Sequence, residues 1–173
     1  SLLQLQAMVE SLLMLARLET GHATLDCTEV IVNDLLQEQW KAMEAEAGKK
    51  AVSICWDLPA RVLITTDASL LGVVLRNILD NAVTYVNRDG EINVAAAMDS
   101  ETGDLQIRIT NTGSIVPSDQ AKMVFERFWR GDTARTTKDG HSGLGLSVVR
   151  RAVTALGGTT SATSQDRLFT ITL

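Results

Sequence analysis

The chain has 173 residues and a formal net charge of −5 at pH 7, and 45% of its residues are hydrophobic. This length fits one domain with a short appendage, and the hydrophobic content suffices for a sizeable core. The acidic balance argues against a nucleic-acid partner, because nucleic-acid surfaces carry basic patches.

Targeting segments and cysteine-based metal sites are not expected either. No apolar run has the length that a bilayer crossing needs, and the first residues do not resemble a signal peptide. The two cysteines, Cys27 and Cys55, stand alone without the spacing of metal ligands. We expect both to be small buried side chains in a reducing compartment, which predicts a cytoplasmic chain.

The first predicted helix spans residues 2–18. Its apolar residues are spaced three and four apart, which is typical of a coiled-coil seam: Leu2, Leu5, Val9, Leu12 and Ala16. Further leucines widen this surface and favour a bundle or dimer interface, with packing against its own domain as the alternative. Gly21 ends the helix, and the small polar residues that follow it mark a boundary.

Short strands and helices alternate in the next part of the chain. We expect strands over 29–32, 52–58 and 62–65, and a helix over 33–47 that Asn33 caps and Gly48 ends. Asp67 is expected to cap the central helix, which ends at Val86 before the turn Asn87–Gly90.

The second half of the chain continues this alternation. Strands are expected over 91–98 and 105–110, a break over 111–117, a helix over 118–128, a second helix from Gly143 to about Leu156, and closing strands over 159–163 and 168–173. The sum is an α+β sandwich with helices on one face of a sheet.

Asn77 and Asn81 are the unusual residues of the central helix. They lie four residues apart and therefore on the same side of the helix. Asparagine is a poor helix former, so some compensating role is expected. Two interpretations stay open: a solvated pair, or a pair directed into a pocket whose carboxamide oxygens meet a hard cation.

A glycine-rich loop, Gly140–Gly145, precedes the last helix. Glycines permit close approach of a ligand, and free amides at a helix N-terminus favour phosphate. His141 in this loop and His22 in the earlier turn are expected to be loop residues, since no partner carboxylate is identifiable. Four basic residues surround the loop and could meet a polyphosphate, with a solvated face as the alternative: Arg127, Arg130, Arg135 and Lys138.

The order and spacing of four motifs resembles the catalytic and ATP-binding domain of sensor histidine kinases, within the gyrase–Hsp90–histidine kinase–MutL ATP-binding fold. The matching segments are Asn77 and Asn81 (asparagine box), Asn111–Gly113 (first glycine box), Phe125–Phe128 (phenylalanine box) and Gly143–Gly145 (second glycine box). The resemblance implies a mixed, mostly antiparallel sheet. Leu18–Gly21 resembles the end of the dimerisation and phosphotransfer hairpin, which gives the divisions 1–21 (hairpin helix), 22–27 (linker) and 28–173 (ATP-binding domain).

The resemblance also implies roles for individual residues. The nucleotide contacts would come from Asn77, Asn81, Tyr85, Asn111, Gly113, Arg127, Arg130, Gly143, Leu144, Gly145 and Leu146, with residues 129–143 as a lid over ATP. Asn81 would bind Mg²⁺, with Asn77 beside it. Asn111 stands where most relatives have Asp, and its carboxamide oxygen can still accept a hydrogen bond from the adenine amino group.

Three departures from the family pattern bear on function. Thr84 occupies a position where a lysine often holds phosphate, and Ile115 replaces the second glycine of its box. The upstream helix with the phospho-accepting histidine is not in this sequence, so no residue here is expected to be catalytic.

The implied activity is that of a protein-histidine kinase, which transfers the ATP γ-phosphoryl group to a histidine outside this chain and then to a response-regulator aspartate. A homodimer through the N-terminal helix is expected, in the cytoplasmic domain of a bacterial inner-membrane protein anchored by upstream segments. The alternative is a degenerate ATP-binding domain that serves as a dimerisation or interaction module. Hydrolysis of the gyrase or Hsp90 kind is disfavoured, because Asn77 replaces the Glu that activates water.

Overall fold

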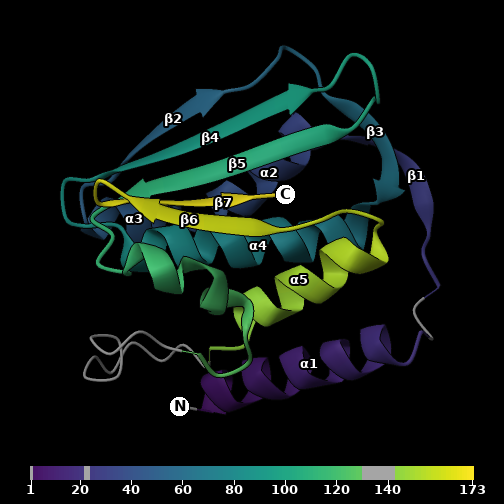
Figure 1. Cartoon of the computed structure of the whole chain (residues 1–173), viewed down its shortest axis with the longest axis horizontal. Helices are drawn as coiled ribbons and strands as arrows, with labels where there is room; N and C mark the ends of the chain where they lie inside the picture. Colours follow the sequence, from purple (N-terminus) through teal and green to yellow (C-terminus); the bar gives the residue numbers. More distant parts are fainter. Residues whose placement is uncertain (1, 22–23, 130–142) are drawn as a thin grey trace.

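The structure, a computed structural model, describes residues 2–21, 24–129 and 143–173. It is a two-layer α+β sandwich with a five-stranded sheet whose helices lie on one face (Figure 1). The strand order is β2 (Ser53–Asp57), β4 (Glu91–Met98), β5 (Leu105–Thr112), β7 (Leu168–Thr172), β6 (Ser161–Gln165), and only the β2–β4 pair is parallel among the described strands. A separate antiparallel pair joins β1 (Cys27–Ile31) and β3 (Leu63–Asp67). The expected fold class is confirmed.

The helical layer is built around one central helix. The helical elements are α1 (Leu2–Glu19), α2 (Val32–Lys41), α3 (Glu44–Lys49), α4 (Ala68–Tyr85), the 3-10 helix η1 (Ser118–Phe125) and α5 (Gly145–Ala155). In Figure 1, α4 lies under the sheet, α5 lies next to it, and α1 runs along the far side of α5. The predicted helix over 118–128 is therefore a 3-10 helix that ends earlier, at Phe125.

The core forms between α4 and the sheet. Leu75 and Leu79 of α4 are fully buried, as are Ile92 and Val94 of β4. Apolar residues repeat along α4 with helical spacing, so they form one continuous face that can be removed from water only against another layer. This packing fixes the rotation of α4 and therefore the direction of its polar side chains.

The N-terminal end of α4 is capped by Asp67, as expected. The carboxylate accepts hydrogen bonds from Leu70 N–H and Asp26 N–H, each at 2.9 Å. The hydrogen bond from Leu70 N–H is the largest influence that lowers the pKa of Asp67, followed by that from Asp26 N–H. The cap thus satisfies one of the free amides of the first turn and joins β1 to the start of α4.

The predicted cap at Asn33 is wrong. Helix α2 begins at Val32, and its N-cap residue, Ile31, makes no side-chain cap. The Asn33 side chain instead bonds to the segment before β3: Nδ2 donates to Pro59 O at 2.9 Å, and Oδ1 accepts from Val62 N–H at 2.8 Å. These partners lie far away in sequence, so local spacing did not reveal them. The single helix expected over 33–47 is also two helices, α2 and α3.

The expectation of buried cysteines is wrong as well. Both Cys27 and Cys55 are exposed. Successive strand residues point to opposite faces, and on β2 Ile54 and Trp56 pack against the core, so Cys55 between them faces outward. Cys27 is the first residue of β1.

Helix α1 packs on its own domain through Leu15, with Met14 and Leu18 beside it. Leu15 is 2% exposed and packs with Leu144 and Val148 at the start of α5. Val9 and Leu13 stay 47% and 55% exposed, so part of the apolar surface remains uncovered. None of the helices in residues 2–21, 24–129 and 143–173 has the length and hydropathy of a membrane-spanning segment.

We predict that Asp67→Ala lowers the free energy of unfolding by about 1 kcal/mol at pH 7, the usual effect of removing an N-cap. The pKa of Asp67 is lower in the folded chain, so the carboxylate contributes stability above its unfolded pKa, and this contribution is lost as the pH falls through the folded value. The difference between the two proteins should shrink below about pH 4. Urea titrations at several pH values measure it.

Two variants serve as controls for this prediction. Asp67→Asn keeps an acceptor oxygen and should unfold close to the wild type at pH 7. Asp57→Ala changes an exposed carboxylate at the end of β2 and should have little effect. If Asp67→Ala lowered the free energy of unfolding equally at pH 7 and pH 3, a role for the carboxylate charge would be contradicted.

Candidate functional site

The asparagine pair of α4 lies beside the start of α5. Asn77 and Asn81 are both half-buried. Asn77 Nδ2 donates to Val73 O at 2.8 Å within the helix. Asn77 Oδ1 faces Gly145, where an added Cβ atom would lie only 2.8 Å from it. Gly145 thus lets the first turn of α5 approach α4 closely.

The second glycine box is held in place by its leucines. Leu144 is fully buried and Leu146 is 9% exposed, and each belongs to a hydrophobic cluster. Gly143 has a φ of +70°, and its carbonyl accepts a hydrogen bond from Phe128 N–H at 3.0 Å. The leucine side chains therefore anchor the loop in the core, which leaves backbone groups of Gly143 and Gly145 to meet a ligand.

Asn111 ends a row of core residues on β5. Contrary to the break expected over 111–117, Asn111 lies within the strand and pairs with Ile92 of β4 and Phe169 of β7. Strand alternation puts Asn111 on the same inner face as Ile107 and Ile109, and it is only 2% exposed. Gly113, with a φ of +86°, follows directly. A buried carboxamide at the end of an apolar row is a candidate for reading a ligand's polar edge.

The end of α4 lies at the same end of the sandwich as Asn111, because the short turn after α4 leads into β4 opposite Asn111. Tyr85, the last residue of α4, is 40% exposed. Lys50 Nζ donates to the carbonyl oxygens of Val83 and Thr84, at 2.8 and 2.5 Å, and so compensates the free carbonyls of this helix end. Lys50 was not expected from the sequence, because its partners lie more than thirty residues away.

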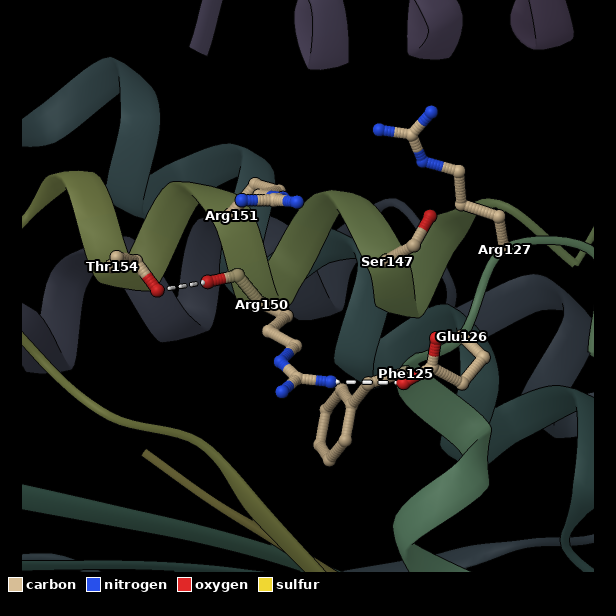
Figure 2. Close-up of a pocket in the computed structure, with 7 residues that line it drawn as sticks. All are labelled: Phe125, Glu126, Arg127, Ser147, Arg150, Arg151 and Thr154. Carbon is tan, nitrogen blue, oxygen red and sulfur yellow. Dashed lines mark hydrogen bonds and ion pairs between the residues drawn. The ribbon is translucent and has the colours of Figure 1, made fainter. Parts of the chain in front are cut away.

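Arg127, expected to reach phosphates, points toward α1. It forms an ion pair with Glu19, which also pairs with Arg151 at 3.5 Å. Figure 2 shows its guanidinium directed upward, toward α1. It borders a polar groove of about 290 Å³ lined by Phe125, Glu126, Arg127, Ser147, Arg150, Arg151 and Thr154. This groove contains neither asparagine of α4, so we separate it from the asparagine site.

Several expected residues lie outside the described part of the chain. These are His22, Arg130, Arg135, Lys138 and His141, together with all of the expected lid except its two ends. Within the described residues, no group of three or more His, Cys, Asp and Glu side chains could hold a metal ion.

The sandwich fold, the asparagine pair of α4 and the glycine loop before α5 together indicate the class of the protein. A family model described as "Histidine kinase-, DNA gyrase B-, and HSP90-like ATPase" matches residues 66–173, which contain all four motifs. The chain belongs to this family.

Curated relatives and solved structures agree with this assignment. The chain is 31% identical over 153 residues to the sensor-like histidine kinase SenX3 of Mycobacterium tuberculosis, covering 88% of this chain and 37% of the relative. It is 30% identical over 161 residues to the sensor protein CzcS of Cupriavidus metallidurans, covering 93% and 33%. The chain thus spans about a third of the length of these relatives.

Two solved structures share the fold. The histidine kinase AdeS of Acinetobacter baumannii superposes with a TM-score of 0.78 at 23% identity, covering 98% of this chain and 77% of that one. Full-length ShkA, solved in complex with AMPPNP, superposes with a TM-score of 0.80 at 26% identity, covering 97% of this chain and 35% of that one.

We predict that Gly145→Ala lowers the free energy of unfolding by about 1–2 kcal/mol, because the new methyl group would overlap Asn77 Oδ1. This opposes the usual gain when alanine replaces a helical glycine. In an Asn77→Ser background the same substitution should be neutral or stabilising, and urea titrations of the four proteins measure this coupling.

Gly48→Ala in α3 is the matched control, since no atom lies within 4 Å of its added Cβ, and it should be neutral or slightly stabilising. Equal effects of Gly145→Ala in the wild-type and Asn77→Ser backgrounds would show that Asn77 does not limit this position.

Proposed function

We propose that this chain is the ATP-binding kinase domain of a two-component sensor histidine kinase. It would transfer the ATP γ-phosphoryl group to a histidine outside this chain, from which a response-regulator aspartate receives it. The observation that carries the proposal is the close approach of Asn77 on α4 to Gly145 on α5. It brings the asparagine box and the second glycine box into one site, and the named relatives are sensor histidine kinases.

The nucleotide would lie between α4 and the loop before α5. Backbone amides of Gly143 and Gly145, at the start of α5, suit phosphate oxygens, since a helix N-terminus favours anions. Asn111 and Gly113 would bind the adenine, and the exposed ring of Tyr85 would contact the same end of the ligand. The complex of ShkA with AMPPNP supports a nucleotide in this fold.

The asparagine side chains fit a Mg²⁺ ion that the ATP phosphates share. Asn81 would supply a carboxamide oxygen, with Asn77 beside it, because oxygen ligands suit a hard cation. When bound, the ion neutralises charge that develops on the transferred phosphoryl group. Asn77 Nδ2 donates to Val73 O, and Oδ1 is the atom of this side chain that could meet the cation.

Phosphoryl transfer is favoured over ATP hydrolysis because the site lacks a base at the position nearest the glycine loop. Asn77 carries a carboxamide, which cannot take a proton from water. In the kinase reaction the acceptor is a histidine from outside this chain. These residues therefore need only position the nucleotide and balance its charge.

We also propose that residues 1–21 are the end of the dimerisation and phosphotransfer hairpin, that 22–27 link it to the domain, and that 28–173 form the ATP-binding domain. The exposed side chains of Val9 and Leu13 suit a homodimer. A response regulator is the second proposed partner, as ThkA, which shares this fold at 18% identity, was solved in complex with the response regulator TrrA. The whole protein would be anchored in a bacterial inner membrane through segments outside this sequence.

A second candidate function is a degenerate ATP-binding domain that acts as a dimerisation or interaction module. The exposed apolar surface of α1 favours this alternative. The Glu19–Arg127 ion pair favours it as well, because the guanidinium of Arg127 was expected to bind phosphate and instead binds Glu19. If the wild-type chain did not bind ATP, this alternative would be favoured.

We predict that a fluorescent ATP analogue binds the wild-type chain more tightly with Mg²⁺ than without it. Asn81→Ala should remove the Mg²⁺-dependent part and raise Kd by about tenfold, the effect of losing one metal contact of about 1.4 kcal/mol. Asn93→Ala is the matched control, because Asn93 lies on β4, away from α4 and the glycine loop, and should bind like the wild type.

Unchanged Mg²⁺-dependent affinity in Asn81→Ala would refute the metal assignment. In the same preparation, incubation with radiolabelled ATP should leave the chain unlabelled, since its acceptor histidine lies elsewhere. Stable label on His22 or His141 would contradict this part of the proposal.

A further inference from the structure

Hydrogen bonds connect the turn after α4 with the end of β5. Thr112 Oγ1 donates to Asn87 Oδ1 at 2.7 Å and accepts from Glu91 N–H at 3.0 Å. Gly90 N–H donates to Asn87 O at 3.1 Å, which closes the turn. The Thr112 side chain therefore joins three elements, namely α4 through its following turn, β4 and β5.

This junction is packed too tightly for other side chains. A Cβ atom at Gly113 would lie 2.5 Å from Asn87 Oδ1, and one at Gly90 would lie 2.6 Å from Thr112 Oγ1. Gly113 also has a φ of +86°, which favours glycine. The peptide group between Thr112 and Gly113 is thus held in one orientation, with Asn87 packed against it.

The carbonyl of that peptide group determines how the Asn111 carboxamide is turned. Asn111 Nδ2 donates to Thr112 O at 3.1 Å. The opposite rotamer would place Oδ1, a second acceptor, against the same carbonyl oxygen and is unfavourable. Within the described residues no donor reaches Asn111 Oδ1, although the side chain is only 2% exposed. Buried oxygens almost always have a donor, so Oδ1 suits a donor from a ligand.

A carboxamide discriminates between purines only when its orientation is fixed. Adenine presents an exocyclic amino donor where guanine presents a carbonyl acceptor. A carboxamide that can rotate offers Oδ1 to the first and Nδ2 to the second, whereas a carboxylate offers acceptors in either orientation. The motif resemblance puts Asn111 where most relatives have Asp, so selectivity in this chain requires contacts that fix the orientation of the amide.

We propose that Asn87 and Thr112 are positioning residues that hold the Asn111 carboxamide with its oxygen toward the nucleobase. The site thereby selects purine nucleotides that carry an amino group at C6 of the base and rejects those that carry a carbonyl there. This proposal rests on the proposed ATP-binding function of the same site.

The test compares Kd values of MgATP and MgGTP, measured by displacement of a fluorescent nucleotide. The wild type should prefer ATP by about fiftyfold or more, since a buried acceptor rejects a second acceptor. Asn87→Ala and Thr112→Val should each lower this preference for ATP at least about fivefold, because ATP binds more weakly and GTP binds more tightly when the amide can rotate. Thr112→Ser keeps the hydroxyl and should restore the wild-type ratio, and Asn93→Ala should leave both Kd values unchanged.

An Asn111→Asp background separates positioning from a general loss of structure. Both carboxylate oxygens accept hydrogen bonds, so Asn87→Ala should leave the ATP-to-GTP ratio unchanged there, while a purely structural effect would persist. Circular dichroism and thermal melts establish that each variant is folded.

The proposal is overturned if folded Asn87→Ala and Thr112→Val both keep the wild-type ratio, or if the wild type binds ATP and GTP equally. Those outcomes leave ATP binding intact and so concern positioning alone. Failure of the wild type to bind either nucleotide would instead overturn the proposed function, and this proposal with it.

Discussion

The packing of α4 against the sheet is the constraint on which the rest of the site depends. Leu75, Ile78 and Leu79 can be removed from water only on the sheet side, which leaves Asn77 and Asn81 at the edge of the buried face. The helix is held at both ends, by the Asp67 cap at its start and by Lys50 at its last carbonyls. A helix fixed in rotation and in length presents its two carboxamides in a constant position, as a binding site requires.

The other parts of the site are positioned relative to this helix. The α5 helix approaches closely because residue 145 is glycine, and β5 is joined to the turn after α4 by the Asn87–Thr112 hydrogen bond. The α1 helix is held chiefly by Leu15, since exposed ion pairs such as Glu19–Arg127 contribute little to stability. The proposed nucleotide site therefore belongs to the sandwich, and α1 contacts it through the packing of Leu15 on Leu144.

The sequence predicted the features that depend on local pattern and motif order. The sandwich and the Asp67 cap are confirmed, because apolar periodicity and capping chemistry act over a few residues. Features that depend on distant partners were missed or wrong. Asn33 bonds to the segment before β3 instead of capping α2, Lys50 reaches the end of α4, and Cys55 faces outward because of strand alternation. Asn87 carried only a turn signal, and its bond to Thr112 became visible once β4 and β5 were paired.

The central claim is that the asparagines of α4 and β5 surround bound ATP. Side-chain amide resonances of isotope-labelled protein report this directly, because the chain has six asparagines, and Asn33 and Asn93 lie on other elements than Asn77, Asn81 and Asn111. On addition of MgATP, the account predicts large shifts for the amides of Asn77, Asn81 and Asn111, and none for Asn33 and Asn93. Shifts confined to backbone amides of the groove around Arg150 and Arg151, with the three asparagine resonances unmoved, would contradict it.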